Sequence, residues 1–144
     1  MGIPALAVSL ETEPEYHLSY SGEIDFSVAA HFTAHFARLM LEKHFPPDVD
    51  VLKVDVPCDA TPDTPWAVTR LSRKRYYVPI TPDRASWDVP AQLDYRLEED
   101  ATKDLPDSDV YAVRVKRIVS VTPLSLDMTS RLDLQAFEQL LREG

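Results

Sequence analysis

A continuous apolar run near the start of the chain limits the folds that this sequence can adopt. Residues Ile3 to Leu10 are apolar apart from Pro4 and Ser9. A run of this length is typical of a β-strand that is covered on both faces, as in a parallel α/β sheet. Such a strand needs partner strands and covering helices. Within this sequence, they have to come from the segments that follow it.

A long amphipathic helix is predicted over residues Phe26 to His44. Asp25 is placed to cap it, and Pro46-Pro47 stops it. Its apolar side follows the i, i+3, i+4, i+7 spacing of a helix that packs by one face. The residues of this side are Ala29, Phe32, Phe36, Leu39 and Met40.

Two histidines lie on the opposite side of the same helix, together with Arg38 and Glu42. His31 and His35 are four residues apart and could in principle share a metal ion. The glutamate that acts as the base in an H-E-x-x-H motif is missing between them. An exposed helix face is therefore the favoured interpretation.

Four further segments are predicted as strands from their alternating or β-branched composition. These are Val51 to Pro57, Trp66 to Leu71, Tyr76 to Ile80 and Gln92 to Leu97. The last two are expected to pair as a hairpin arm, because the proline-flanked residues from 80 to 90 between them are typical of a projecting loop.

The C-terminal third predicts a helix, a strand and a second helix. Ser108 can cap a short helix from Asp109 to about Lys116. Ile118 to Thr122 is a β-branched strand that Pro123 must end or push to a sheet edge, because proline has no N–H to donate. Beyond it, Leu124 to Asp127 is extended, and Thr129 or Ser130 is expected to cap a final helix. That helix is predicted over Leu132 to Arg142.

Composition excludes several classes of protein. The 144 residues fit one domain, and their net charge of −9 argues against a general nucleic-acid binder. No apolar run approaches the roughly 20 residues needed to cross a bilayer. The single cysteine, Cys58, excludes an internal disulfide framework, and we expect a cytoplasmic protein. Two basic clusters, residues 70–75 and 114–117, could contact a phosphate, although solvated faces or inter-subunit ion pairs are commoner.

Few residues of the chain carry recognisable catalytic chemistry. The three glycines, at positions 2, 22 and 144, allow neither a phosphate-binding P-loop nor a G-x-G-x-x-G turn. The pairs Asp48/Asp50 and Asp107/Asp109 could hold Mg²⁺ or Mn²⁺ through their oxygens. Both pairs lie in turns, where aspartate is favoured for bonding to the backbone, so a turn or cap role is the preferred interpretation. The residues alone thus predict a soluble α/β domain with a hairpin arm.

Several segments, taken together, resemble the SurE family of survival-protein nucleotidases. They are the opening run Gly2 to Leu10, the strand Val51 to Pro57 (V-L-K-V-D-V-P), the segment Thr69 to Tyr76 (T-R-L-S-R-K-R-Y) and the run Asp107 to Leu124. Lys53 and Asp55 stand where that family usually has asparagines, and Ser72 stands where glycine is common. The match is to the C-terminal part of the family.

The resemblance implies a function that these residues would serve only in part. SurE proteins are phosphatases that use a divalent metal, Mg²⁺ or Mn²⁺, and act on nucleoside monophosphates. Their metal site lies in an N-terminal Rossmann-like half, in N-D-D-G and S-G-x-N segments, and neither segment occurs here. We therefore carry over no catalytic residue and no metal ligand, and expect the chain to be inactive by itself. Either it acts with a catalytic half supplied elsewhere, or it is a stand-alone, non-catalytic oligomerisation or binding module.

The resemblance also implies how the chain is built and assembled. It predicts residues 1–144 as the C-terminal portion of a Rossmann-type, three-layer α/β fold, with a projecting arm at Tyr76 to Leu97 and a C-terminal helix. The segment from Leu124 to Arg142 would be exchanged with a neighbouring subunit in a homo-oligomer. Arg73, Arg75 and Tyr76 would border either the active-site cleft or a subunit contact, or they would simply cover the base of the arm.

Overall fold

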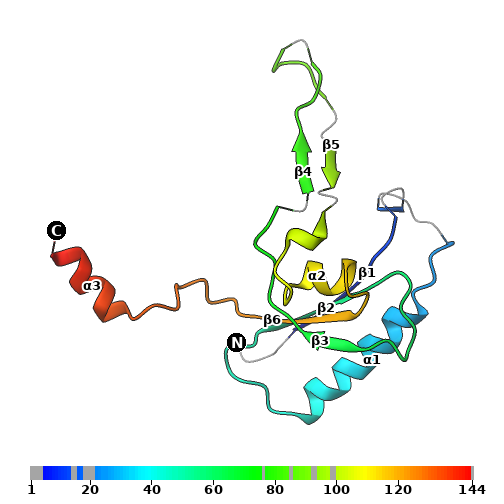
Figure 1. The fold of residues 1–144 in the computed structure, drawn as a ribbon, viewed down its shortest axis with the longest axis horizontal. Coiled ribbons are helices and arrows are strands. Elements are labelled where there is room, and N and C mark those ends of the chain that lie inside the picture. The colour runs from blue at the N-terminus through cyan, green and yellow to red at the C-terminus, as the bar shows by residue number, and fades with distance from the viewer. Residues whose placement is uncertain are drawn as a thin grey trace.

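The fold is a four-stranded mixed sheet with a long helix on one face and a short helix on the other (Figure 1). The computed structural model describes residues 5–13, 16–17, 22–75, 77–84, 86–91, 94–97 and 100–143. The strand order is β1-β2-β6-β3, with β1 parallel to β2, β2 antiparallel to β6, and β6 parallel to β3. The strands are β1 (Ala5–Leu10), β2 (Val51–Val56), β3 (Trp66–Val68) and β6 (Val119–Leu124).

The long helix α1 (Ser27–Glu42) supplies the apolar core. Asp25 accepts a hydrogen bond from the backbone N–H of Ser27 at 2.8 Å, at the predicted start of the helix. Ala29, Phe32 and Phe36 are buried on the side predicted from the helical spacing. The core that contains the two phenylalanines is completed by alternate strand residues: Leu52, Val54, Val56, Val119 and Val121.

Within the residues that the structure describes, the first strand is covered on one face, whereas its apolar run predicted cover on both. β1 lies at one edge of the sheet, and Ala5, Ala7 and Ser9 are exposed on one of its faces. Leu6, Val8 and Leu10 are half-buried and pack against the core on the other face. The reason is that α1 covers a single face of the sheet, whereas the short helix on the other face contacts β6 and β2.

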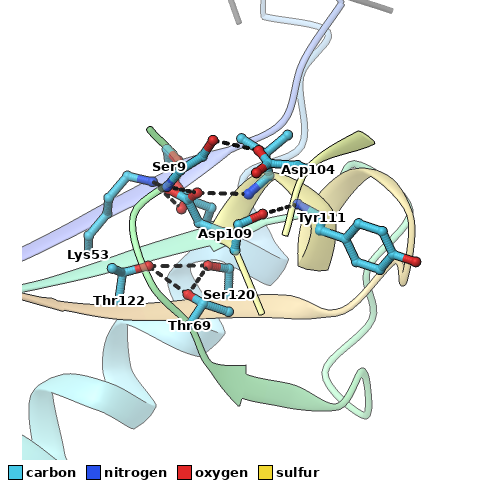
Figure 2. A network of polar contacts seen from close by, with 12 residues as sticks. Ser9, Lys53, Thr69, Asp104, Asp109, Tyr111, Ser120 and Thr122 are labelled. Carbon is cyan, nitrogen blue, oxygen red and sulfur yellow. Dashed lines mark hydrogen bonds and ion pairs between the residues drawn. The ribbon is translucent and has the colours of Figure 1, made fainter. Parts of the chain in front are cut away.

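The second face of the sheet is polar. Helix α2 (Asp109–Arg114) lies over it, and its N-terminus is capped by Ser108, whose hydroxyl accepts from the Tyr111 N–H at 3.1 Å, as predicted. Beneath it three hydroxyls are buried together: Thr69 Oγ1 lies 2.8 Å from Ser120 Oγ and 2.7 Å from Thr122 Oγ1 (Figure 2). Because each hydroxyl has a partner, this layer avoids the cost of burying unpaired polar groups.

Pro123 neither ends β6 nor lies in an edge strand, which corrects the sequence-based expectation. It pairs with Leu52 in a strand that lies between two others. The backbone N–H of residue 119 and the backbone C=O of residue 121 make their hydrogen bonds on the β3 side of the strand. Since alternate residues bond to the same side, the nitrogen of residue 123 also faces β3. β3 has already ended at Val68, opposite Val121. Proline is therefore tolerated, because its nitrogen faces a part of the sheet beyond the end of β3.

The predicted arm is confirmed. β4 (Tyr77–Ile80) and β5 (Asp94–Leu97) pair antiparallel and project from the body of the molecule (Figure 1). The rings of Tyr77 and Tyr95 meet edge-to-face across the arm, with their centroids 5.1 Å apart. The predicted strand residues Tyr76, Gln92 and Leu93 lie outside the described residues. A 3-10 turn, η2 (Ala101–Lys103), follows the arm and precedes α2.

The final helix α3 (Leu134–Arg142) stands apart from the sheet, at the end of an extended connection (Figure 1). Its cap is Asp133 rather than the expected Thr129 or Ser130, since Asp133 Oδ1 accepts from the backbone N–H groups of Gln135 and Ala136. None of its residues is buried. No helix in the described part of the chain is long and apolar enough to cross a membrane.

Candidate functional site

A cleft of about 790 Å³ opens at the carboxyl ends of the parallel strands β1 and β2. In open α/β sheets, this is the edge at which ligands bind. Strand β1 contributes Ser9 and Leu10, β2 contributes Lys53 and Asp55, and α2 forms a further wall. The other lining residues are Glu11, Thr12, Glu13, His17, Val56, Cys58, Tyr77, Asp109, Val110, Val113, Arg114 and Arg117.

The floor of the cleft is a chain of charged and polar contacts (Figure 2). The hydroxyl of Ser9 donates to Asp55 Oδ1 at 2.8 Å, and Asp55 in turn pairs with the ammonium of Lys53. The same ammonium lies 2.8 Å from Oδ2 of Asp109, whose side chain is only 6% exposed. Lys53 and Asp55 reach the cleft because they alternate with Leu52, Val54 and Val56, which face the core.

The ammonium of Lys53 is held in its charged form. Burial alone would lower the pKa of Lys53, but hydrogen bonds to Asp109 and Asp55 outweigh it, and the pKa is raised above its ordinary value. The lysine is therefore a fixed positive charge between two carboxylates at neutral pH.

One rim of the cleft is tied together by Arg117. Its guanidinium lies 2.8 Å from Glu11 and 2.5 Å from Asp59, and these bonds raise its pKa further. Glu11 also accepts the backbone N–H of Cys58 at 3.1 Å and lies 3.6 Å from Arg114. The rim thus joins the loop after β1, the loop after β2 and the end of α2.

The cleft offers little positive charge to an anion. Three cations, Lys53, Arg114 and Arg117, line it together with four carboxylates, those of Glu11, Glu13, Asp55 and Asp109. Each of the three cations already has a carboxylate partner. A phosphate group entering the cleft would have to displace one of these partners.

The part of the chain that the structure describes does not fit a divalent-metal site. Among the described residues, no three side chains of the metal-binding types His, Cys, Asp and Glu converge. In the two predicted aspartate pairs, Asp50 bonds the backbone N–H of Leu126, and Asp109 bonds Lys53. Their partners are also engaged at the surface: Asp48 lies 3.7 Å from Arg131, and Asp107 lies 2.6 Å from Arg70. His31 and His35 are exposed.

The predicted border residues fall on the segment that leads into the arm. Arg73 and Arg75 are exposed there, and Tyr76 lies outside the described residues. Tyr77, the first described residue after them, lines the cleft. A role for Arg73, Arg75 and Tyr76 at the cleft or at a subunit contact stays a prediction. Sequence reasoning missed Lys53 and Asp55 as site residues, although two charged side chains inside an otherwise apolar strand are a usable signal.

Comparison with known proteins agrees with this fold. A family model described as "Survival protein SurE" matches residues 1–78. The 5'-nucleotidase SurE of Thermococcus gammatolerans is 43% identical over 141 residues, which cover 97% of this chain and 52% of the relative. That of Methanocella arvoryzae is 36% identical over an alignment of 146 positions, which covers 99% of this chain and 54% of the relative.

A solved structure gives the same result. The crystal structure of the SurE protein from Aquifex aeolicus superimposes with a TM-score of 0.67 at 25% identity, over 97% of this chain and 52% of that one. The chain therefore spans about half the length of the proteins that it matches, and it belongs to the SurE family.

Proposed function

We propose that these residues form the C-terminal part of a SurE-type, divalent-metal-dependent 5'-nucleotidase that acts on nucleoside monophosphates. The observation that carries the proposal is the 43% identity to a 5'-nucleotidase SurE over nearly the whole of this chain. The part proposed here supplies scaffold and assembly surfaces and is not catalytic by itself. A cytoplasmic location agrees with the single cysteine, since cytoplasmic proteins rarely contain disulfides.

The chemistry of the described residues supports the non-catalytic role. The carboxylates best placed to bind a metal ion are those of Asp55 and Asp109. Both form ion pairs with Lys53, which lies between them. Since these residues do not fit a metal, the Mg²⁺ or Mn²⁺ of the proposed enzyme would be held by ligands outside this chain. The cleft would then form one wall of the substrate site, adjoining the part that holds the ion.

The role in assembly is supported by α3. Leu134, Phe137, Leu140 and Leu141 are between 44% and 66% exposed on α3. A helix with such an apolar side is stable only when that side packs on something. We propose that the segment from Leu124 to Arg142 packs on a second copy of the chain, and that the arm adds to the same contact.

A second candidate function is a stand-alone oligomerisation or binding module. The observation that favours it is the same exposed α3, which needs no catalytic half to find a partner copy. The coding sequence upstream of residue 1 separates the two candidates. A frame, intact or shifted, that encodes the Asp-Asp-Gly and Ser-Gly-x-Asn segments supports the nucleotidase. Unrelated sequence supports the module.

The direct test is reconstitution. This chain is co-expressed with the N-terminal part of the Thermococcus gammatolerans relative that its match leaves uncovered. We expect the two pieces to co-purify and to release phosphate from nucleoside monophosphates with Mn²⁺, whereas neither piece does so alone. The relative's own two parts, expressed together, are the positive control. Activity in that control without activity in the mixture would contradict the proposal.

A further inference from the structure

The buried carboxylate of Asp109 joins three segments that are distant in sequence (Figure 2). It receives the ammonium of Lys53 from β2 at 2.8 Å and the backbone N–H of Ser72 at 2.8 Å. It also receives the N–H of Val110, in the first turn of α2, at 2.8 Å. A buried carboxylate with this set of donors fixes all three segments, because loss of any donor would leave a desolvated charge less well compensated.

The segment that it fixes on one side is the root of the arm. The Ser72 hydroxyl bonds to Asp104, just after η2, and accepts the backbone N–H of Lys74 at 3.2 Å. Five residues after Ser72, the chain enters β4 at Tyr77, which lines the cleft. The anchored Ser72 thus lies five residues before the point at which the arm meets the cleft wall.

The ammonium of Lys53 is already paired with two carboxylates. Two of its three N–H bonds go to Asp109 and Asp55, and Asp55 is itself fixed by Ser9. A lysine that lines a cleft is usually read as a ligand for anions. Here an incoming anion would compete with two carboxylates, one of them on a side chain that is only 6% exposed.

We propose that Lys53 is a positioning residue: by holding the charged Asp109 it fixes Ser72, and so sets the root of the arm and Tyr77 against the cleft. It does not bind the anionic group of a ligand. The proposal rests on the described contacts alone, and it holds whether or not the cleft accepts a nucleotide.

The test is backbone amide hydrogen exchange, followed by NMR on the full 144-residue chain. The variants are Lys53→Met, Asp109→Asn and the double variant. Asp107→Asn is the matched control, because it removes an exposed ion pair, Arg70–Asp107, between the same two stretches of chain. In Lys53→Met we expect exchange of the Ser72 amide and of the β4 amides to rise about tenfold or more, as for a lost buried hydrogen bond. We expect no change for β2 and β6 amides that lie away from residue 53, or anywhere in Asp107→Asn.

Rescue of Lys53→Met by Asp109→Asn distinguishes a positioning role of Lys53 from a general loss of stability. The side-chain amide introduced by Asp109→Asn still offers an oxygen to the Ser72 N–H but has no charge to compensate. In the double variant, protection of the Ser72 amide should therefore return to that of Asp109→Asn alone. Should Lys53→Met fail to fold, the proposal requires that the double variant does fold.

Three results would overturn the proposal. The first is an unchanged Ser72 amide in Lys53→Met. The second is a double variant as poorly protected as Lys53→Met, or one that fails to fold when Lys53→Met fails. The third is a shift of the Lys53 Nζ signal when inorganic phosphate is added at millimolar concentration, which would make the lysine an anion ligand.

Discussion

The guanidinium of Arg117 lies 2.5 Å from the carboxylate of Asp59, although the backbone of Arg117 is in the left-handed region, with φ at 53°. That conformation costs a residue with a side chain about 1–2 kcal/mol, and glycine is preferred there. From this turn the side chain bonds to both Asp59 and Glu11. The strained turn between α2 and β6 is thus held by its own side chain.

Replacement of Arg117 separates backbone strain from ion pairing. Both Arg117→Ala and Arg117→Gly lose the bonds to Asp59 and Glu11, but only glycine relieves the strain. We expect Arg117→Gly to be more stable than Arg117→Ala by about 1 kcal/mol in urea unfolding. Equal free energies of unfolding would show that the turn is not strained in solution.

The buried hydroxyl layer predicts a strongly non-additive set of variants. Thr69→Val leaves Ser120 and Thr122 buried, with their oxygens 3.5 Å apart and their best partner gone. We expect a loss of about 1–3 kcal/mol in the free energy of unfolding. The triple variant, in which Ser120→Ala and Thr122→Val are added, should cost less than the sum of the single changes, because no unpaired hydroxyl remains.

A matched control for the hydroxyl layer is Thr61→Val, which alters a hydroxyl pair at the surface. This change should fall within the small range of ordinary surface substitutions. If Thr69→Val is as mild as Thr61→Val, the three hydroxyls do not form a buried network.

The ion pairs of Lys53 give a pH dependence with a defined sign. The pKa of Lys53 is raised in the folded state, because its bonds to Asp109 and Asp55 outweigh the effect of burial. The contribution of Lys53 to stability is therefore complete below the ordinary lysine pKa of about 10.4. It is lost as pH rises through the higher pKa of the folded state. The difference in unfolding free energy between the wild type and Lys53→Met should be constant at neutral pH and shrink above about pH 10.5. A constant difference up to pH 12 would contradict the shift.

The apolar side of α3 predicts self-association. We expect the wild-type chain to be an oligomer, or poorly soluble, in size-exclusion chromatography with light scattering. Phe137→Ser combined with Leu140→Ser should shift it toward monomer, because both side chains are exposed in the single chain and would be buried against a second copy. Gln139→Ala, a polar change on the same helix, should leave the oligomer intact. A sharp monomer peak with a cooperative melt for the wild type would contradict this expectation.

Features with local causes were predictable from the sequence. Helix α1 followed from its apolar spacing, the cap at Ser108 from its place before Asp109, and the arm from two alternating segments around prolines. In each case the residues that decide the structure lie within one turn or one hairpin of each other.

Features that depend on distant neighbours were not predictable. The exposed face of β1 depends on where α2 lies, and the tolerance of Pro123 within β6 depends on where β3 ends. The cap of α3 was misplaced because Thr129, Ser130 and Asp133 are all residue types that cap helices, and only the chain path selects Asp133. The cleft was missed for the same reason, since Lys53 and Asp109 are 56 residues apart.

Titration of the 144-residue chain with Mn²⁺, followed by paramagnetic broadening of its NMR signals, is the sharpest test of whether these residues form part of a nucleotidase without its metal site. We expect only weak, diffuse broadening near exposed carboxylates, and no phosphate release from nucleoside monophosphates. Selective loss of the Asp55 and Asp109 signals at one equivalent of Mn²⁺, together with phosphate release that Asp109→Ala abolishes, would contradict this expectation.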